Sequence, residues 1–72
     1  MELVKNKASG KYFVVLDDAG EDDFLVITPE GKVKRLERRL FAAQETADHR
    51  GAPRFSHLTQ TQMDKYTEYL NG

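Results

Sequence analysis

Residues 12–16 read Tyr12-Phe13-Val14-Val15-Leu16, an unbroken run of aromatic and aliphatic side chains. Aromatic and β-branched residues favour strands, and the run is too short for an ordinary helix. It therefore predicts a central β-strand that is buried on much of both faces. The preceding stretch, Leu3-Val4-Lys5-Asn6, predicts a first strand, and Ala8-Ser9-Gly10-Lys11 supplies the turn between the two.

An acidic segment, residues 17–23, follows this strand and contains Gly20. Its carboxylates repel one another and do not belong in a core, so the segment predicts an exposed loop. Phe24-Leu25-Val26-Ile27-Thr28 predicts the next strand. Thr28-Pro29-Glu30-Gly31 has proline and glycine where a type I turn prefers them, so Lys32-Val33-Lys34-Arg35-Leu36 is expected to return antiparallel as a hairpin.

The C-terminal half begins with an ambiguous hydrophobic period, which leaves helix and continued strand both open for residues 37–45. We predict a helical turn or short helix over residues 38–45, an exposed loop over 46–53 and a last short strand over 54–58. Thr59-Gln60-Thr61-Gln62 has the pattern of a capping box and predicts a helix over residues 60–70. The side chains expected to face the sheet from this helix are Met63, Tyr66, Tyr69 and Leu70.

Together these elements predict a mainly β fold with a C-terminal α-helix: a small, SH3-like, antiparallel and partly open barrel. At 72 residues the chain has room for one domain, residues 1–72, and one small core. The helix is expected to cover an open edge of the barrel. The chain has no cysteine and no apolar stretch long enough to span a bilayer, so we expect a soluble cytoplasmic protein without a membrane partner.

The order of the Ser9-Gly10-Lys11 turn, the strand after it, an acidic loop and the hairpin with Gly31 resembles the KOW-type SH3-like barrels of several ribosomal proteins and their bacterial relatives. Phe55-Ser56-His57-Leu58 is similar to the way in which some of those domains close. In that family the glycine-centred turn and the basic residues beside it commonly lie on an RNA-facing loop. The resemblance therefore implies that Lys7, Gly10 and Lys11 contact RNA or the ribosome.

A second basic region follows the hairpin turn and is interrupted only by Glu37. The net charge is −1, so an anionic partner must be met by a local patch rather than by the whole molecule. One interpretation is a binding surface, because lysine and arginine can neutralise phosphates and arginine can bind them in a bidentate manner. The other interpretation is a solvated face whose charge balances the acidic segment. The opposed charges are expected to give a dipolar surface. We define the basic segment as Lys32, Lys34, Arg35, Arg38 and Arg39.

Binding of single-stranded RNA also requires exposed aromatic side chains on which bases stack. The candidates are Tyr12, Phe41 and Tyr66, with Tyr69 beside them. The alternative is that the tyrosines are half-buried with a hydrated hydroxyl. Phe13, Phe24 and Phe55 lie in apolar runs and are assigned to the core.

No pattern in the chain predicts a catalytic or metal site. His49 and His57 have no zinc-ligand spacing, and the acidic segment lacks the ligand positions of an EF-hand loop. We therefore predict no cofactor, no metal and no enzymatic activity. The leading hypothesis is a small binding module that contacts RNA or the ribosome. The alternatives are a protein-interaction domain that uses an aromatic groove or a sheet edge, and an accessory subunit of a larger assembly.

Overall fold

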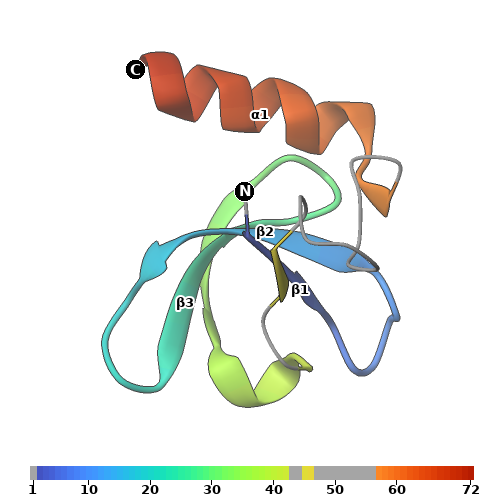
Figure 1. Cartoon of the computed structure of the whole chain (residues 1–72), viewed down its shortest axis with the longest axis vertical. Coiled ribbons are helices and arrows are strands. Elements are labelled where there is room, and N and C mark those ends of the chain that lie inside the picture. The colour runs from blue at the N-terminus through green and yellow to red at the C-terminus, as the bar shows by residue number, and fades with distance from the viewer. Residues whose placement is uncertain (1, 43–44, 47–56) are drawn as a thin grey trace.

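The computed structural model describes residues 2–42, the backbone of residues 45–46, and residues 57–72. Five antiparallel strands form one sheet in the order β4-β3-β2-β1-β5, and the C-terminal helix α1 lies across one side of it (Figure 1). The sheet curls without closing. This confirms the predicted mainly β, partly open antiparallel fold with a C-terminal helix. The elements are β1 Glu2–Lys5, β2 Tyr12–Asp18, β3 Asp23–Ile27, β4 Val33–Glu37, the 3₁₀-helix η1 Arg38–Leu40, β5 Glu45–Thr46 and α1 Gln60–Asn71.

The core consists of two hydrophobic clusters, one on each face of the sheet. Successive strand residues point to opposite faces, and the register sets Leu3 opposite Val14 and Val14 opposite Ile27. This row faces α1, and Tyr66 and Leu58 pack on it. Because β2 contributes to both clusters, the predicted burial of this strand on both faces is confirmed. The other face holds Val4, Val15, Phe24, Val26 and Phe41, with Phe13 and Leu36 packed against them.

A β-bulge interrupts the pairing of β2 with β3. Val15 is opposite Val26, whereas Asp17 is opposite Leu25, so Leu16 is an extra residue on β2. Bulges bend a strand and re-aim the side chains beside them. The strand continues through the bulge to Asp18, so the prediction that the whole acidic segment is a loop is wrong at its two ends, where Asp17, Asp18 and Asp23 lie in strands.

The β3–β4 hairpin forms as predicted, and its turn contacts α1. The Gly31 N–H donates to the Thr28 carbonyl at 2.8 Å. Gly31 has φ +82°, a conformation that favours glycine. A Cβ atom at this position would also overlap the Thr61 side chain and lie 3.1 Å from the Thr61 carbonyl oxygen. Gly31 therefore permits both the turn and the close approach of the helix.

The N-terminal end of α1 carries the capping box that the sequence predicted, and the same residues hold it to the sheet. The Thr59 hydroxyl accepts from the Gln62 N–H at 3.1 Å, and the Gln62 Oε1 accepts from the Thr59 N–H at 2.9 Å. Gln62 is fully buried, and its Nε2 donates to the carbonyls of Tyr12 at 2.8 Å and Ile27 at 3.2 Å. One glutamine side chain therefore closes the helix cap and joins the helix to two strands.

The region between β4 and α1 departs from the prediction. The predicted helix over residues 38–45 is limited to the single turn η1, because Phe41 turns into the core and bridges Asn6 in extended conformation. Residue 46, predicted as loop, lies in β5, which pairs with β1. His57 and Leu58 form a turn rather than the end of a strand. The rest of the predicted loop and last strand is residues 47–56, which include Phe55 and lie outside the described residues.

Candidate functional site

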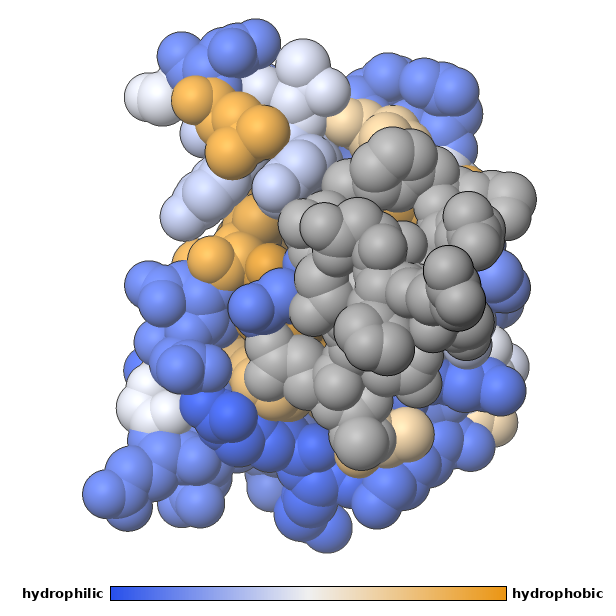
Figure 2. Space-filling view, viewed as in Figure 1, coloured by the Kyte–Doolittle hydropathy of each residue, from blue (hydrophilic) through white to orange (hydrophobic). Residues whose placement is uncertain are grey.

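An open groove of about 590 Å³ lies between α1 and the bulged end of β2. Figure 2 shows an indentation at the left of the view, below the C-terminal end of α1, with hydrophobic atoms on the helix above it and on the sheet below it. We call it the helix–sheet groove. It is lined by Glu2, Val15, Leu16, Asp17, Asp18, Arg38, Tyr66, Tyr69 and Leu70.

The helix forms one wall of the groove with side chains that the sequence placed on its sheet-facing side. Tyr66 packs on the sheet, and Tyr69 and Leu70 line the groove, but they are 46% and 65% exposed, so the sheet does not bury them. Gln62 is the only residue that α1 buries fully. The helix is held to the sheet by the Gln62 hydrogen bonds at its N-terminal end, and its last turn lines the groove beside β2. The deepest contact of the helix is therefore a polar capping residue rather than one of its hydrophobic side chains.

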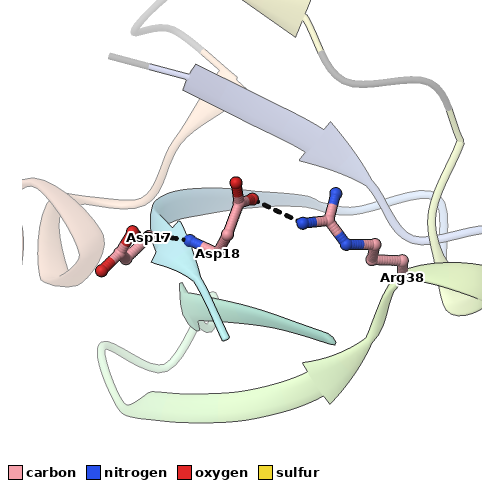
Figure 3. A network of polar contacts seen from close by, with 3 residues as sticks. All are labelled: Asp17, Asp18 and Arg38. Atoms are coloured by element: carbon pink, nitrogen blue, oxygen red, sulfur yellow. Dashed lines mark hydrogen bonds and ion pairs between the residues drawn. The ribbon is translucent and has the colours of Figure 1, made fainter. Parts of the chain in front are cut away.

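The opposite wall of the groove carries two neighbouring carboxylates with different roles. The Asp18 Oδ1 accepts from Arg38 Nη2 at 2.6 Å, whereas the Asp17 Oδ1 accepts only from the Asp18 N–H at 2.8 Å (Figure 3). Asp17 forms no ion pair within the described part of the chain. Of these two aspartates, Asp18 is neutralised and Asp17 has no ion-pair partner among the described residues, and Glu2 is a third carboxylate in the lining.

Arg38 also closes the end of the groove through contacts with the core. Its guanidinium carbon lies 4.3 Å from the centre of the Phe24 ring, within the range of a cation–π interaction. Its backbone N–H donates to the Asp22 carbonyl at 2.7 Å, and its Nε is buried without a hydrogen-bond partner among the described residues. Arg38 is therefore fixed by the fold rather than extended toward solvent.

The three arginines of the basic segment all pair with carboxylates of this chain, which corrects the predicted dipolar surface. Arg38 pairs with Asp18, and Arg35 Nε lies 2.7 Å from Asp23 Oδ2. The antiparallel register of β3 and β4 brings the acidic segment and the basic segment together, because Asp23 is opposite Glu37 beside η1. The two charged segments therefore neutralise one another in part. The third pair, Arg39 with Glu37 at 2.6 Å, is exposed, and its hydrogen bond and charge raise the pKa of Arg39.

The lysines predicted to contact RNA remain exposed and outside these pairs. Lys7 and Lys11 flank the β1–β2 turn, where the Asn6 Oδ1 accepts from the N–H groups of Ala8 and Ser9. Gly10 completes the turn with φ +72°. Lys32 and Lys34 lie on the β3–β4 hairpin and are exposed as well. None of these four lysines forms an ion pair in the described part of the chain.

The aromatic candidates are dispersed. Phe41 is 4% exposed and packs edge-on against Phe13, so its prediction as a contact residue is wrong. Tyr12 is half-buried and makes an edge-on contact with His57, with 5.0 Å between ring centres. It lines a second hollow of about 330 Å³ with Gly10, Lys11, Pro29, His57, Thr59 and Gln62. Tyr66 is half-buried and lines the helix–sheet groove instead.

The three aromatic candidates therefore do not form one stacking surface. The sequence analysis did not assign Leu16, Asp17 or Leu70 to a site, because a strand bulge and the exposed end of a helix leave no periodic signal.

In the described residues no group of three or more His, Cys, Asp or Glu side chains is arranged to hold a metal ion. No described helix is long and apolar enough to cross a membrane. Comparisons with family models, curated proteins and solved structures find no match for this chain.

Proposed function

We propose that this chain is a non-catalytic protein-interaction module and that the helix–sheet groove is its docking surface. The observation that carries the proposal is the exposure of Tyr69 and Leu70, which line the helix side of this groove. A partner segment in the groove would cover apolar surface that the fold leaves in water. Removal of apolar surface from water stabilises a complex by about 25 cal/mol per Å².

The chemistry of the lining favours binding over nucleophilic catalysis. The described residues that line the groove include no serine, cysteine, histidine or lysine. The arginine present is engaged with Asp18 and Phe24. The lining combines four charged side chains with apolar ones, so a partner segment would need both polar and apolar contacts. A short segment in an open groove of this size buries little area, so the expected complex is weak and transient.

The test is selection of a random twelve-residue peptide library against the folded domain, followed by mapping of the selected peptides by ¹H–¹⁵N chemical-shift changes. Peptides that shift the amides of Leu16, Asp17, Tyr66 and Leu70 support the proposal. Leu70→Ala should weaken them at least fivefold, whereas Leu40→Ala removes an exposed leucine that does not line the groove and should leave binding unchanged. Failure to select any peptide, or shift changes confined to other surfaces, would overturn it.

RNA contact is a second candidate, and the four exposed lysines favour it. Phosphate contacts make affinity fall steeply with salt. The variant that tests it is Lys7→Gln with Lys11→Gln, because these side chains have no structural partner, whereas Arg38 is part of the fold. In a fluorescence-anisotropy titration with a mixed RNA pool, binding that decreases with salt and is lost in this variant supports the second candidate. Absence of binding at low salt would exclude it for free RNA.

A further inference from the structure

The chemistry of the helix–sheet groove specifies what kind of segment it fits, and this step rests on the proposed function. Three features meet there: an unneutralised carboxylate, the C-terminal end of a helix and an exposed apolar wall. The first two features favour a cation in the ligand, and the third favours apolar side chains.

The bulge at Leu16 accounts for the carboxylate. An uninterrupted strand would alternate, so that Leu16 and Asp17 pointed to opposite faces. With the extra residue, Leu16 packs toward the α1 side of the sheet and Asp17 lines the same groove. The Asp18 N–H donates to one oxygen of Asp17. This bond fixes the carboxylate and leaves its second oxygen available to a donor.

The helix adds negative potential to the same place. The last turn of a helix carries a partial negative charge from its unpaired carbonyl groups, which basic residues commonly offset. The last turn of α1 contains no basic residue. Tyr69 and Leu70 belong to this turn and line the groove, so the uncompensated end of the helix lies beside it.

We infer that the helix–sheet groove binds a partner-protein segment in which a lysine or arginine is adjacent to apolar side chains. The cation pairs with Asp17 near the end of α1, and the apolar side chains cover Tyr69 and Leu70. Tyr66 and Tyr69 strengthen this preference, because aromatic faces attract cations. Arg38 does not occupy this position, since its guanidinium is bound to Asp18 and lies over Phe24.

The test uses three acetylated and amidated peptides of sequence Ala-Leu-X-Leu-Ala, where X is arginine, its neutral isostere citrulline, or glutamate. Chemical-shift titration of the ¹⁵N-labelled domain should place the arginine peptide at Leu16, Asp17 and Tyr69. The citrulline peptide should bind at least fivefold more weakly, and the glutamate peptide more weakly still. Raising the ionic strength from about 20 mM to about 300 mM should reduce the affinity of the arginine peptide and not that of the citrulline peptide.

Asp17→Asn should remove the preference for arginine over citrulline. Glu21→Gln makes the same charge change at an exposed residue of the acidic segment outside the groove lining, and it should retain that preference. Equal affinity of the three peptides would overturn the inference. If the library yields peptides that bind the groove but lack a cationic preference, the proposed function stands and the inference fails.

Two further results would be decisive. If neither the library nor the arginine peptide shifts the groove amides, the proposed function and the inference fail together. If the groove amides shift with dilution of the domain alone, the occupant is a second copy of this chain, and the inference of a separate partner is overturned. Sedimentation of the unliganded domain at several concentrations checks this alternative.

Discussion

The hydrogen bonds of Gln62 make it the residue of α1 on which the stability of the domain depends most. In Gln62→Ala, the Tyr12 and Ile27 carbonyls lose their bonds at 2.8 and 3.2 Å, and the capping box loses one of its two bonds. A buried group without its partner costs about 1–3 kcal/mol, and loss of an N-cap bond about 1 kcal/mol. Two carbonyls at about 1 kcal/mol each and the cap bond at about 1 kcal/mol give a loss of about 3 kcal/mol in the unfolding free energy. The higher helix propensity of alanine reduces this loss by a few tenths of a kcal/mol.

That loss is large for a chain of 72 residues. Domains of this size are stable by about 4–11 kcal/mol, at about 0.05–0.15 kcal/mol per residue. Urea unfolding followed by far-UV circular dichroism measures the difference. Gln60→Ala is the matched control, because Gln60 is exposed in the same helical turn and bonds only to the Asp64 side chain at 2.9 Å. We expect the control to change the unfolding free energy by less than about 0.5 kcal/mol.

Gln62→Glu gives the same reasoning a pH dependence. A carboxylate at this buried position would face the two carbonyl oxygens, so folding raises its pKa above the value of about 4.3 expected for the unfolded chain. A raised pKa means that the protonated form stabilises the fold. The variant should therefore be closest to wild type below about pH 4.3 and lose stability as the pH rises through the folded-state pKa. A difference between wild type and variant that is independent of pH, or a Gln62→Ala loss no larger than that of Gln60→Ala, would refute the role assigned to Gln62.

Three further substitutions test the fold. Gly31→Ala combines a left-handed backbone conformation with a clash against Thr61, and we expect a loss of about 1–3 kcal/mol in urea unfolding; an unchanged midpoint would contradict the close approach of α1. Val14→Asp buries an unpaired charge at a fully buried position and should abolish cooperative folding, whereas a sharp thermal transition in this variant would show that the strand is not central. Arg35→Gln should cost less than about 1 kcal/mol, because the Arg35 side chain is 65% exposed in its pair with Asp23; a larger loss by urea unfolding would mean that this pair is structural.

The sequence predicted the parts of the fold whose signals are local. The central strand, the Thr28–Gly31 turn and the capping box each depend on residues within a few positions, and each is confirmed. The helix-like spacing around Phe41 was misleading, because the position of this side chain is decided by residues distant in the chain. Phe41 packs with Phe13 and Phe24, which belong to two other strands, and such contacts leave no mark on local periodicity.

The charge pattern was misread for a related reason. Lys32 to Arg39 is basic as a stretch of sequence, and an isolated stretch of this kind resembles a phosphate-binding patch. The register of the hairpin decides otherwise, since it sets the basic strand beside the acidic segment and pairs Arg35 with Asp23. Charge counted along the chain therefore overstated the charge presented to a partner. The separate prediction that Lys7 and Lys11 contact RNA, which came from the resemblance, stays a prediction.

The two ends of α1 differ in how closely they contact the sheet. Its N-terminal turn carries the capping box, the Gln62 bonds to two strands and the contact with Gly31, whereas every residue after Tyr66 is exposed. Substitutions at the N-terminal end should therefore change the unfolding free energy, and substitutions of Tyr69 or Leu70 should change binding with little effect on unfolding. A helix selected for stability alone would bury an apolar stripe along its whole length. In α1 the first turn is anchored, whereas Tyr69 and Leu70 of the last turn stay in water beside the bulged strand and Asp17. The proposal that the last turn contributes to a surface for a partner accounts for this difference.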